Sequence, residues 1–590
     1  MSKTGRNPND PIENLAIGKI IEVDGSHVVA ELDPGIQELS RIYGGETYPI
    51  GQFGSIVKIH FGRRLIYGYV GRLRMKAEYD REIGLAPVVT EDARVIEADL
   101  FGEAEWVLDS SATPPTWALR FERGVSTFPL PQQTMYLTPS SELRSIYGHG
   151  KGATLEIGEH VGSAGAPCYA DLNELLGKHT AILGSTGSGK SGAVAAILHS
   201  LREHGSKMKY PNWKPQIVIL DPHNEYAIAF KDSKSLSTDA NTLSLPYWLL
   251  SSQETFALFI GKTEFVATSQ TNIIKKTLWE ARKSGASALG LDANKITIDS
   301  PVPYDLDLLV KNIEDDRNKI TAASKQDSHN SILDKIEVLR NDARMRFLMN
   351  PWDKKVDSFP KIMAQFIGDS SLISIIDLSG VPNEVAGIAS AVIARTLFSF
   401  KIWQTAEERE RNPILLICEE AHRYVPNRGE AQYEAAQEAI RRIAKEGRKY
   451  GLGLMLVSQR PSEVEETVLS QCNSWIVLRI ANDTDREHVK SILPDSLAGL
   501  TKVLSGLRRR EAIFVGQAAM LPSRIMIRHL EKEMLPKSHD IDFDKGWQAE
   551  PLSEDVIRSI ANRWRFQAKS LEKHQSGDER KAGTTEVVSS

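Results

Sequence analysis

Two patterns of apolar and polar residues divide the chain. From about residue 15 to 145, the two kinds alternate in short runs bounded by glycines, as in FGSIVKIHFG, RLIYGYVGRL and ARVIEADL. Such alternation predicts β-strands with one buried face, and Asp24–Gly25 between two β-branched runs is typical of a hairpin. Many short strands favour a small β-barrel, while a sandwich remains the alternative.

After about residue 150, near-continuous apolar runs alternate with helix-like segments. The runs are TAIL (180–183), QIVILD (216–221), SLISIIDLS (371–379), PILLICEE (413–420), GLGLMLVSQ (451–459), SWIVLRIA (474–481) and EAIFVG (511–516). Strands of this kind, separated by helices, predict a parallel sheet buried on both faces. A ligand of such an α/β sheet is expected at the carboxyl ends of its strands.

A polar stretch interrupts this alternation. Between about 250 and 350 the apolar residues recur at helical spacing, as in SILDKIEVLRNDARMRF. The predicted domains are therefore a β-barrel at 1–148, an α/β core at 149–250 and 351–535, and an inserted helical bundle at 251–350. A C-terminal extension at 536–571 and a polar tail at 572–590, predicted to be disordered, complete the chain.

The segment GSTGSGKS at 184–191 lies between the run TAIL and the amphipathic SGAVAAILHSL. Its G-x-x-x-x-G-K-S spacing is that of a phosphate-binding loop, and a flexible Gly/Ser linker lacks such flanks. The glycines bring backbone N–H groups to a polyphosphate, at the N-terminus of the next helix. Lys190 would reach the β- and γ-phosphates and Ser191 would ligate Mg²⁺. The predicted nucleotide contacts are Gly184, Ser185, Thr186, Gly187, Ser188, Gly189, Lys190, Ser191 and Gly192, and the nucleotide is ATP.

Two adjacent carboxylates, Glu419 and Glu420, end the run PILLICEE. In a triphosphatase the first acid steadies Mg²⁺ through water, together with the loop serine, and the second positions the attacking water. A solvated turn is the alternative, which the phosphate loop disfavours. Gln459 ends the next run and is predicted to sense the γ-phosphate, with a polar strand cap as the alternative.

Further polar residues lie at strand ends and on one helix. Asp221, His223 and Glu225 follow QIVILD and could add an acidic patch near the metal, but their spacing does not indicate a transition-metal site. The segment EAAQEAIRRIAKEGRKYG carries Arg441, Arg442 and Arg448. Arg448, and after it Arg442, are candidates for an arginine that reaches a neighbour's γ-phosphate. A solvated basic helix face is the alternative.

Charge and cysteine content further narrow the class of protein. The net charge of −5 does not support a globally basic nucleic-acid binder but allows a local basic pore. Three widely spaced cysteines disfavour a disulfide framework or zinc site and suit a reducing cytoplasm. The polar N-terminus has no apolar signal core, and no apolar run is expected to span a membrane.

Five segments, in order, carry a family resemblance: HTAILGSTGSGKS, LDPHNEYA, IIDLSG, LLICEEAHRYVP and EGRKYGLGLMLVSQRPSEV. Together they resemble the HerA-type hexameric DNA translocases, of the same broad group as the FtsK motors, in a bacterial, defence-associated form. The resemblance runs from about residue 12 to the last strands. Two positions depart from the pattern: Glu419 replaces the usual Asp, and Asn224 stands where Gly is expected.

The resemblance implies a RecA-like P-loop core and a homo-hexameric ring with ATP between neighbouring subunits. It also implies duplex DNA in a central pore, to which Arg423 and Arg428 could contribute, although a solvent loop is an equal alternative. The C-terminal extension would pack on a neighbouring subunit. The barrels would dock a separate nuclease or a sirtuin-like NAD-consuming effector, in antiphage defence or DNA end processing.

Other functions remain open at this stage. An ATP-binding ring could assemble and activate an effector, with hydrolysis as a timer. A motor for another polymer, such as a conjugation coupling protein or a protein unfoldase, lacks support because no membrane span or apolar-aromatic pore loop stands out in the sequence.

Overall fold

The computed structural model describes residues 8–36, 38–85, 93–110, 115–148, 153–161, 166–238, 242–260, 267–321, 326–368, 372–379, 383–427, 434–493, 503–537 and 542–566. The predicted tail at 572–590 and Arg428 lie outside these ranges. The chain divides into two compact units. The first comprises 1–215, 398–431 and 437–536, and the second comprises 216–397, 432–436 and 537–590.

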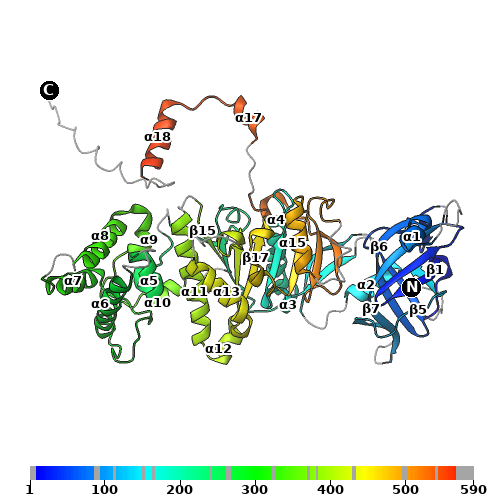
Figure 1. Ribbon diagram of the computed structural model, residues 1–590, viewed down its shortest axis with the longest axis horizontal. Coiled ribbons are helices and arrows are strands. Elements are labelled where there is room, and N and C mark those ends of the chain that lie inside the picture. Colours follow the sequence, from blue (N-terminus) through cyan, green and yellow to red (C-terminus); the bar gives the residue numbers. More distant parts are fainter. Residues whose placement is uncertain are drawn as a thin grey trace, which may run out of the picture. The chain divides into compact units, whose positions relative to one another are not determined.

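A closed antiparallel barrel forms the N-terminal part of the first unit (Figure 1, blue). Its strands follow the order β2-β1-β9-β5-β6-β7, and β2 also pairs with β7, which closes the sheet. The strands are β1 (Ala16–Asp24), β2 (His27–Leu32), β5 (Ile56–Phe61), β6 (Arg64–Met75), β7 (Arg94–Asp109) and β9 (Thr134–Leu137). The closure decides for a barrel and against a sandwich, and Gly25, with φ of 56°, makes the expected hairpin turn.

Smaller elements extend the barrel. Strand β8 (Thr116–Arg123) pairs with β7 outside the closed ring, and β3 (Ser40–Tyr43) forms a separate hairpin with β4 (Glu46–Pro49). Two helices follow the strands, α1 (Lys76–Glu82) and α2 (Ser140–Gly148). The interior is filled by fully buried aliphatic side chains, among them Ile17, Ile59, Ile66, Ile96 and Met135.

The rest of the first unit is a mixed sheet with the strand order β11-β10-β20-β19-β18-β12-β17-β16. Strands β12 (Thr180–Leu183), β16 (Ile414–Glu419), β17 (Leu452–Ser458) and β18 (Ser474–Leu478) are parallel neighbours. Strands β10 (Thr154–His160), β11 (Pro167–Asp171), β19 (Glu511–Gly516) and β20 (Ser523–Ile527) pair antiparallel. The expectation that EAIFVG is a parallel strand is therefore wrong, because β19 pairs antiparallel with β18, with Ser474 opposite Gly516.

Helices connect these strands. They are α3 (Leu172–Gly177), α4 (Lys190–Lys207), α12 (Ala406–Arg411), most of α13 (Glu434–Glu446), α14 (Glu466–Leu469) and α15 (Asp483–Ile492). Helix α4 begins directly after the glycine-rich loop and is buried on all sides from Ala193 to Leu201, instead of along one side as expected of an amphipathic helix. This strand–loop–helix arrangement is the one that the sequence pattern predicts.

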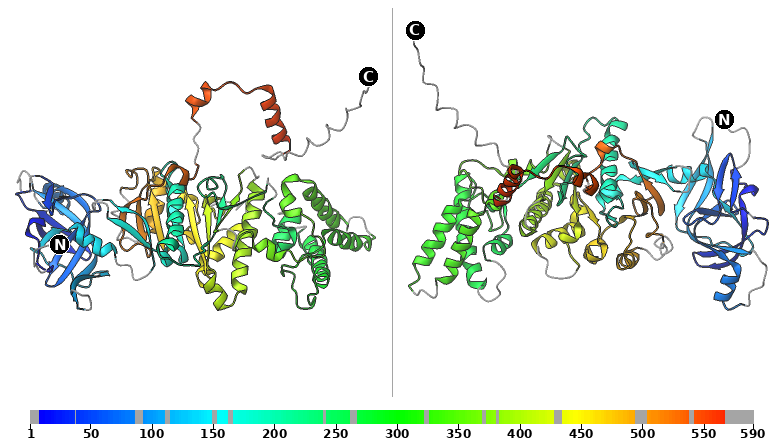
Figure 2. Two further views of the ribbon diagram at one scale, coloured as in Figure 1. Left: turned by 180° about the vertical axis from the view of Figure 1, so that it is seen from behind. Right: turned by 90° about the horizontal axis from the view of Figure 1, so that it is seen from above.

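The second unit combines a parallel three-stranded sheet with a helical insertion. The sheet has the order β13-β15-β14, formed by β13 (Gln216–Asp221), β15 (Ile373–Asp377) and β14 (Lys234–Ser237). The helices are α5 (Ser252–Phe259), α6 (Ala267–Ala288), α7 (Leu306–Asn318), α8 (Asp327–Asn341), α9 (Arg346–Met349), α10 (Phe359–Met363), most of α11 (Asn383–Trp403), α17 (Phe543–Gln548) and α18 (Glu554–Arg565). Figure 2 shows the insertion (green) from two further sides.

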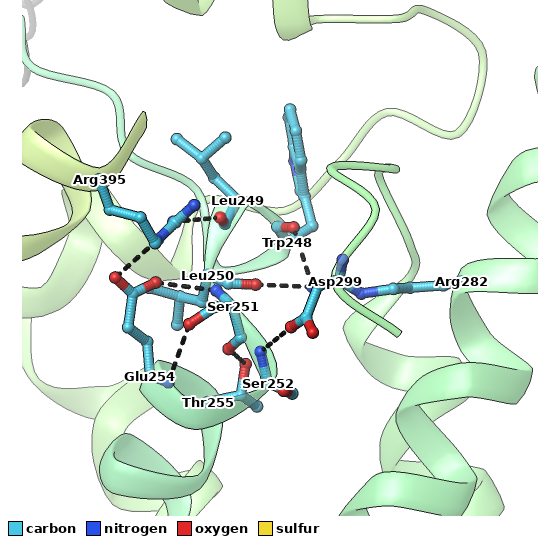
Figure 3. A network of polar contacts seen from close by, with 10 residues as sticks. All are labelled: Trp248, Leu249, Leu250, Ser251, Ser252, Glu254, Thr255, Arg282, Asp299 and Arg395. Carbon is cyan, nitrogen blue, oxygen red and sulfur yellow. Dashed lines mark hydrogen bonds and ion pairs between the residues drawn. The ribbon is translucent and has the colours of Figure 1, made fainter. Parts of the chain in front are cut away.

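A buried arginine and a partly buried one contact the start of the insertion (Figure 3). Arg282 of α6 is fully buried and donates to the carbonyl oxygens of Leu250, at 2.6 Å, and Ser300. Arg395 of α11 donates to Glu254 Oε1 at 2.8 Å and to the Leu249 carbonyl at 2.7 Å. Carbonyl and carboxylate oxygens thus accept from both guanidinium groups, although the buried Nε of Arg282 makes no hydrogen bond among the described residues.

Helix α11 corrects one expectation. Its segment Val385–Trp403 has a mean hydropathy of 1.5 and is long enough to cross a membrane by length and composition. The sequence was expected to contain no such run. About 67% of the tested window is buried inside the protein, as in a core helix.

Candidate nucleotide-binding site

The glycine-rich loop between β12 and α4 has a backbone that larger residues would not adopt. Gly187 and Gly189 have φ of 74° and 105°, in the region that favours glycine. A Cβ on Gly184 would lie 2.7 Å from Ser188 Oγ and 2.9 Å from Leu478 Cβ. The three glycines therefore permit one compact loop.

Hydrogen bonds from three directions hold this loop. Gly184 N–H donates to the Ser458 carbonyl, and Ser185 N–H donates to the Arg479 carbonyl. On the far side, Arg510 N–H donates to the Ser188 carbonyl at 3.1 Å. The loop is thus positioned by the ends of β17 and β18 and by the start of β19.

The loop is suited to a polyphosphate. Ser188 Oγ is buried and makes no hydrogen bond within the described part of the chain. Lys190 opens α4, so its ammonium group and the helix N-terminus favour negative charge at the same place. A buried polar atom without a protein partner, beside a cationic helix start, fits an anionic ligand.

The two carboxylates lie at the same sheet edge as the loop. Across β17, Leu183 pairs with Ser458 and Glu419 pairs with Val457. Neighbouring strands lie about 4.8 Å apart, so the loop start and Glu419 are separated by roughly 10 Å. This spacing leaves room for a γ-phosphate, a hydrated cation and a water between them.

Glu420 has an unusual backbone. Its φ and ψ are 53° and 52°, in the left-handed region, and its side chain is buried. Such a conformation costs free energy for a non-glycine residue and is concentrated at functional sites. The turn redirects the chain directly after β16.

Gln459 is brought to the phosphate loop. It follows the last residue of β17, and its Oε1 accepts a 2.5 Å hydrogen bond from the Thr186 hydroxyl. Lys190, Ser191, Glu419, Glu420 and Gln459 therefore belong to one edge of one sheet. The sequence predicted this grouping from strand ends alone.

The three arginines differ in their surroundings. Arg441 forms an ion pair with Glu465 at 2.6 Å, and the Arg442 guanidinium lies 5.1 Å from the centre of the Phe398 ring. Arg448 is exposed on the 3₁₀ turn η6 (Gly447–Tyr450) and forms no ion pair within the described ranges. Arg423 is also exposed.

The acidic loop after β13 belongs to the second unit. Asp221 is buried and accepts N–H groups from His223 and Tyr226, and burial raises its pKa to about 6. Asn224 has φ of 53°, a conformation that Asn tolerates better than most residues, which explains how it replaces Gly. Among the described residues, no three His, Cys, Asp or Glu side chains gather as metal ligands.

Sequence reasoning missed Arg510 and Glu511. Arg510 has φ of 67°, and its backbone lies against Gly189. Glu511 is fully buried and pairs with Arg508 at 3.2 Å and with Arg524. The run RRRE at 508–511, directly before an apolar strand, could have indicated these residues. Charged residues are seldom buried unless they are paired, so three cations beside an acid at the start of a buried strand favour an ion pair.

The fold and the site define a P-loop ATPase with a RecA-like core, an N-terminal barrel and a helical insertion. Residues 155–397 match the family model described as "Helicase HerA, central domain". The DNA double-strand break repair helicase HerA of Pyrococcus furiosus is 27% identical over 441 residues, which cover 68% of this chain and 73% of the relative. The HerA of Sulfolobus acidocaldarius is 28% identical over 440 residues, covering 72% and 79%.

Among solved structures, VirB4 of Thermoanaerobacter pseudethanolicus matches 65% of this chain and 99% of its own, with 16% identity and a TM-score of 0.46. The family model and the two relatives support the same type of protein as the motifs of the site. Residues 155–397 of the chain are thus similar to the central domain of HerA helicases, and about 70% of the chain is similar to whole HerA proteins.

Proposed function

We propose that this chain is an ATP-driven motor that moves along duplex DNA as a ring of six subunits. The observation that carries the proposal is the joining of phosphate loop, carboxylates and Gln459 at one sheet edge, closed by the Thr186–Gln459 hydrogen bond. The names of the relatives, which are DNA repair helicases, support DNA as the polymer.

Each side chain has a distinct part in hydrolysis. Lys190 and the loop N–H groups hold the phosphates, and Ser191 and Glu419 are the residues that would hold Mg²⁺. When bound, Mg²⁺ neutralises phosphate charge. Glu420 holds the attacking water and accepts its proton, while Gln459 contacts the γ-phosphate.

The active site is completed by a neighbouring subunit. Arg441 is engaged within its own chain, and Arg442 lies over Phe398, whereas Arg448 is exposed without an ion pair in the described ranges. We therefore assign Arg448, ahead of Arg442, as the arginine that stabilises transition-state charge in trans. Hydrolysis then alters the subunit interface and moves pore segments, Arg423 among them, along DNA.

The ends of the chain supply contacts between proteins. Trp547 and Trp564 in the C-terminal extension are 82% and 77% exposed, which supports packing on a neighbouring subunit. On the barrel, Leu108 and Trp117 of the β7–β8 hairpin are exposed and suit a docked nuclease or NAD-consuming effector in antiphage defence or DNA end processing.

The three cysteines are buried free thiols, which fits a protein of the reducing cytoplasm.

The test is steady-state ATP hydrolysis by the purified chain, with and without linear duplex DNA. Lys190→Ala serves as the blank, and Glu420→Gln as a variant that binds ATP without cleaving it. A severalfold rise with DNA is expected. Equal turnover with and without DNA would contradict a DNA motor, and effector activation by Glu420→Gln would favour the ring scaffold instead. Unchanged turnover in Lys190→Ala would overturn the site itself.

A further inference from the structure

The Glu420 carboxylate is buried, and one of its two oxygens lacks a hydrogen-bond donor among the described residues. Within the described part of the chain, its Oε2 is buried and makes no hydrogen bond. A buried carboxylate oxygen without a donor costs free energy, and an unfixed carboxylate holds a water poorly. A neighbouring hydrogen-bond donor would hold this carboxylate oxygen in place.

The nearest candidate donor is His422, on the 3₁₀ turn η5 (Ala421–Arg423) that starts at Glu420. Its Nδ1 lies 3.3 Å from Glu420 Oε2, close but not aligned as a hydrogen bond, and 3.4 Å from Ser458 Oγ. One ring nitrogen thus lies near two side-chain oxygens, one on Glu420 directly after β16 and one on Ser458 at the end of β17. A small rotation of the ring aligns it with one or the other.

Ser458 connects this contact to the rest of the site. Its Oγ accepts the Arg460 N–H at 3.1 Å, and Ser458 directly precedes Gln459. Gln459 in turn accepts from Thr186 of the phosphate loop. An unbroken set of contacts therefore runs from Glu420 through His422 to the strand end that carries Gln459.

We propose that His422 is a positioning residue that orients the Glu420 carboxylate by alternating its Nδ1–H between Ser458 Oγ and Glu420 Oε2. The proposal rests on the role of Glu420 given above. When Nδ1–H donates to Glu420, the carboxylate is fixed to hold water. When it donates to Ser458, Glu420 is released.

Burial, more than the surrounding charges, favours the neutral form of the His422 ring. Glu420, Glu463, Arg460 and Arg423 act on it electrostatically, and burial lowers its pKa. The neutral imidazole has one N–H, so a proton on Nδ1 serves only one acceptor at a time. This single donor is what makes the two arrangements exclusive.

Two substitutions of His422 distinguish a role in positioning Glu420 from a role in folding. His422→Leu removes the donor, while His422→Asn retains an amide N–H near the place of Nδ1. We expect His422→Leu to lower kcat for ATP on the order of tenfold to a hundredfold, with KM and the affinity for a fluorescent ATP analogue unchanged. His422→Asn is expected to recover most of the loss. Melting temperatures check that both variants fold.

The outcomes distinguish this inference from the proposed function. Wild-type turnover in His422→Leu, with an inactive Glu420→Gln, would overturn the role of His422 alone. Equal loss in His422→Leu and His422→Asn, or lost nucleotide binding, would also overturn it. An active Glu420→Gln would overturn the role of Glu420 on which the inference depends.

Discussion

The Thr186 hydroxyl donates a 2.5 Å hydrogen bond to Gln459 Oε1 and so joins the phosphate loop to the carboxyl end of β17. Thr186 is exposed on the loop, and Gln459 is half-buried. A γ-phosphate arriving here offers both side chains a charged acceptor, and such hydrogen bonds are stronger than neutral ones. The contact is therefore expected to rearrange when ATP binds.

We predict that Gln459→Ala lowers kcat for ATP hydrolysis by roughly tenfold to a hundredfold, because a donor to the developing charge is lost. ATP affinity should change little, since the loop amides and Lys190 remain. Thr186→Val, which removes only the tether, should cost less than roughly tenfold. Thr186→Ser retains the hydroxyl and is the matched control. Lost ATP binding in Gln459→Ala would contradict a sensing role.

Arg448→Ala is expected to bind ATP but not cleave it, because the proposed role of Arg448 is to stabilise charge in the neighbouring subunit's site. Mixing Arg448→Ala with Glu420→Gln subunits should restore part of the hydrolysis, since some interfaces then combine an intact Glu420 with an intact Arg448. Lys449→Ala, at an exposed adjacent cation, is the control and should hydrolyse normally. If no mixture regains activity, Arg448 does not act in trans.

Much of this site could be predicted from strand ends. QIVILD and TAIL coincide with β13 and β12, and Glu419 and Gln459 lie at the ends of β16 and β17. A parallel sheet collects the carboxyl ends of its strands at one edge, so apolar runs followed by polar residues were sufficient. The glycine spacing likewise predicted the phosphate-binding loop between β12 and α4.

Other features had no local sign in the sequence. The left-handed backbone of Glu420 depends on the turn into η5, and the apposition of Arg510 and Gly189 joins residues far apart in the chain. The antiparallel direction of β19 was missed because a buried strand has the same apolar run in either direction. Contacts of long sequence separation decide these features.

We predict that stability falls as the pH drops from about 6.5 towards 4, in part through His179. Burial lowers its pKa to about 4, and its Nδ1 accepts the Leu454 N–H at 3.0 Å. The unfolded chain binds a proton near pH 6.5 while the folded chain resists it, so stability is full above that pH and is lost below it.

His179→Asn tests this dependence. Asn offers an oxygen acceptor and tolerates the φ of 60° found at position 179. Melting temperatures measured from pH 7.5 to 4.5 should decline less steeply in His179→Asn than in the natural chain. The slope should not vanish, because burial also lowers the pKa of His160, to about 3. Parallel slopes would show that His179 does not contribute.

The exposed tryptophans of the C-terminal extension lead to a prediction about assembly. Trp547 and Trp564 lie on α17 and α18 and are far more exposed than tryptophans of a folded protein usually are. Burial of such a side chain at an interface is worth about 2 kcal/mol or more. Trp547→Ser with Trp564→Ser should therefore shift the protein towards smaller assemblies at low concentration, with the melting temperature of the chain little changed.

Mass measurement in solution across a dilution series checks this shift. Trp403→Ser is the matched control, because Trp403 is 88% exposed but lies at the end of α11, outside the extension. A double variant that assembles as the natural chain does would exclude the extension from the ring interface. Equal dissociation of the control would instead indicate a general effect of removing exposed tryptophan. Dissociation confined to the double variant, accompanied by lost hydrolysis, would link the extension to the proposed shared active site, because the role proposed for Arg448 requires an assembled interface.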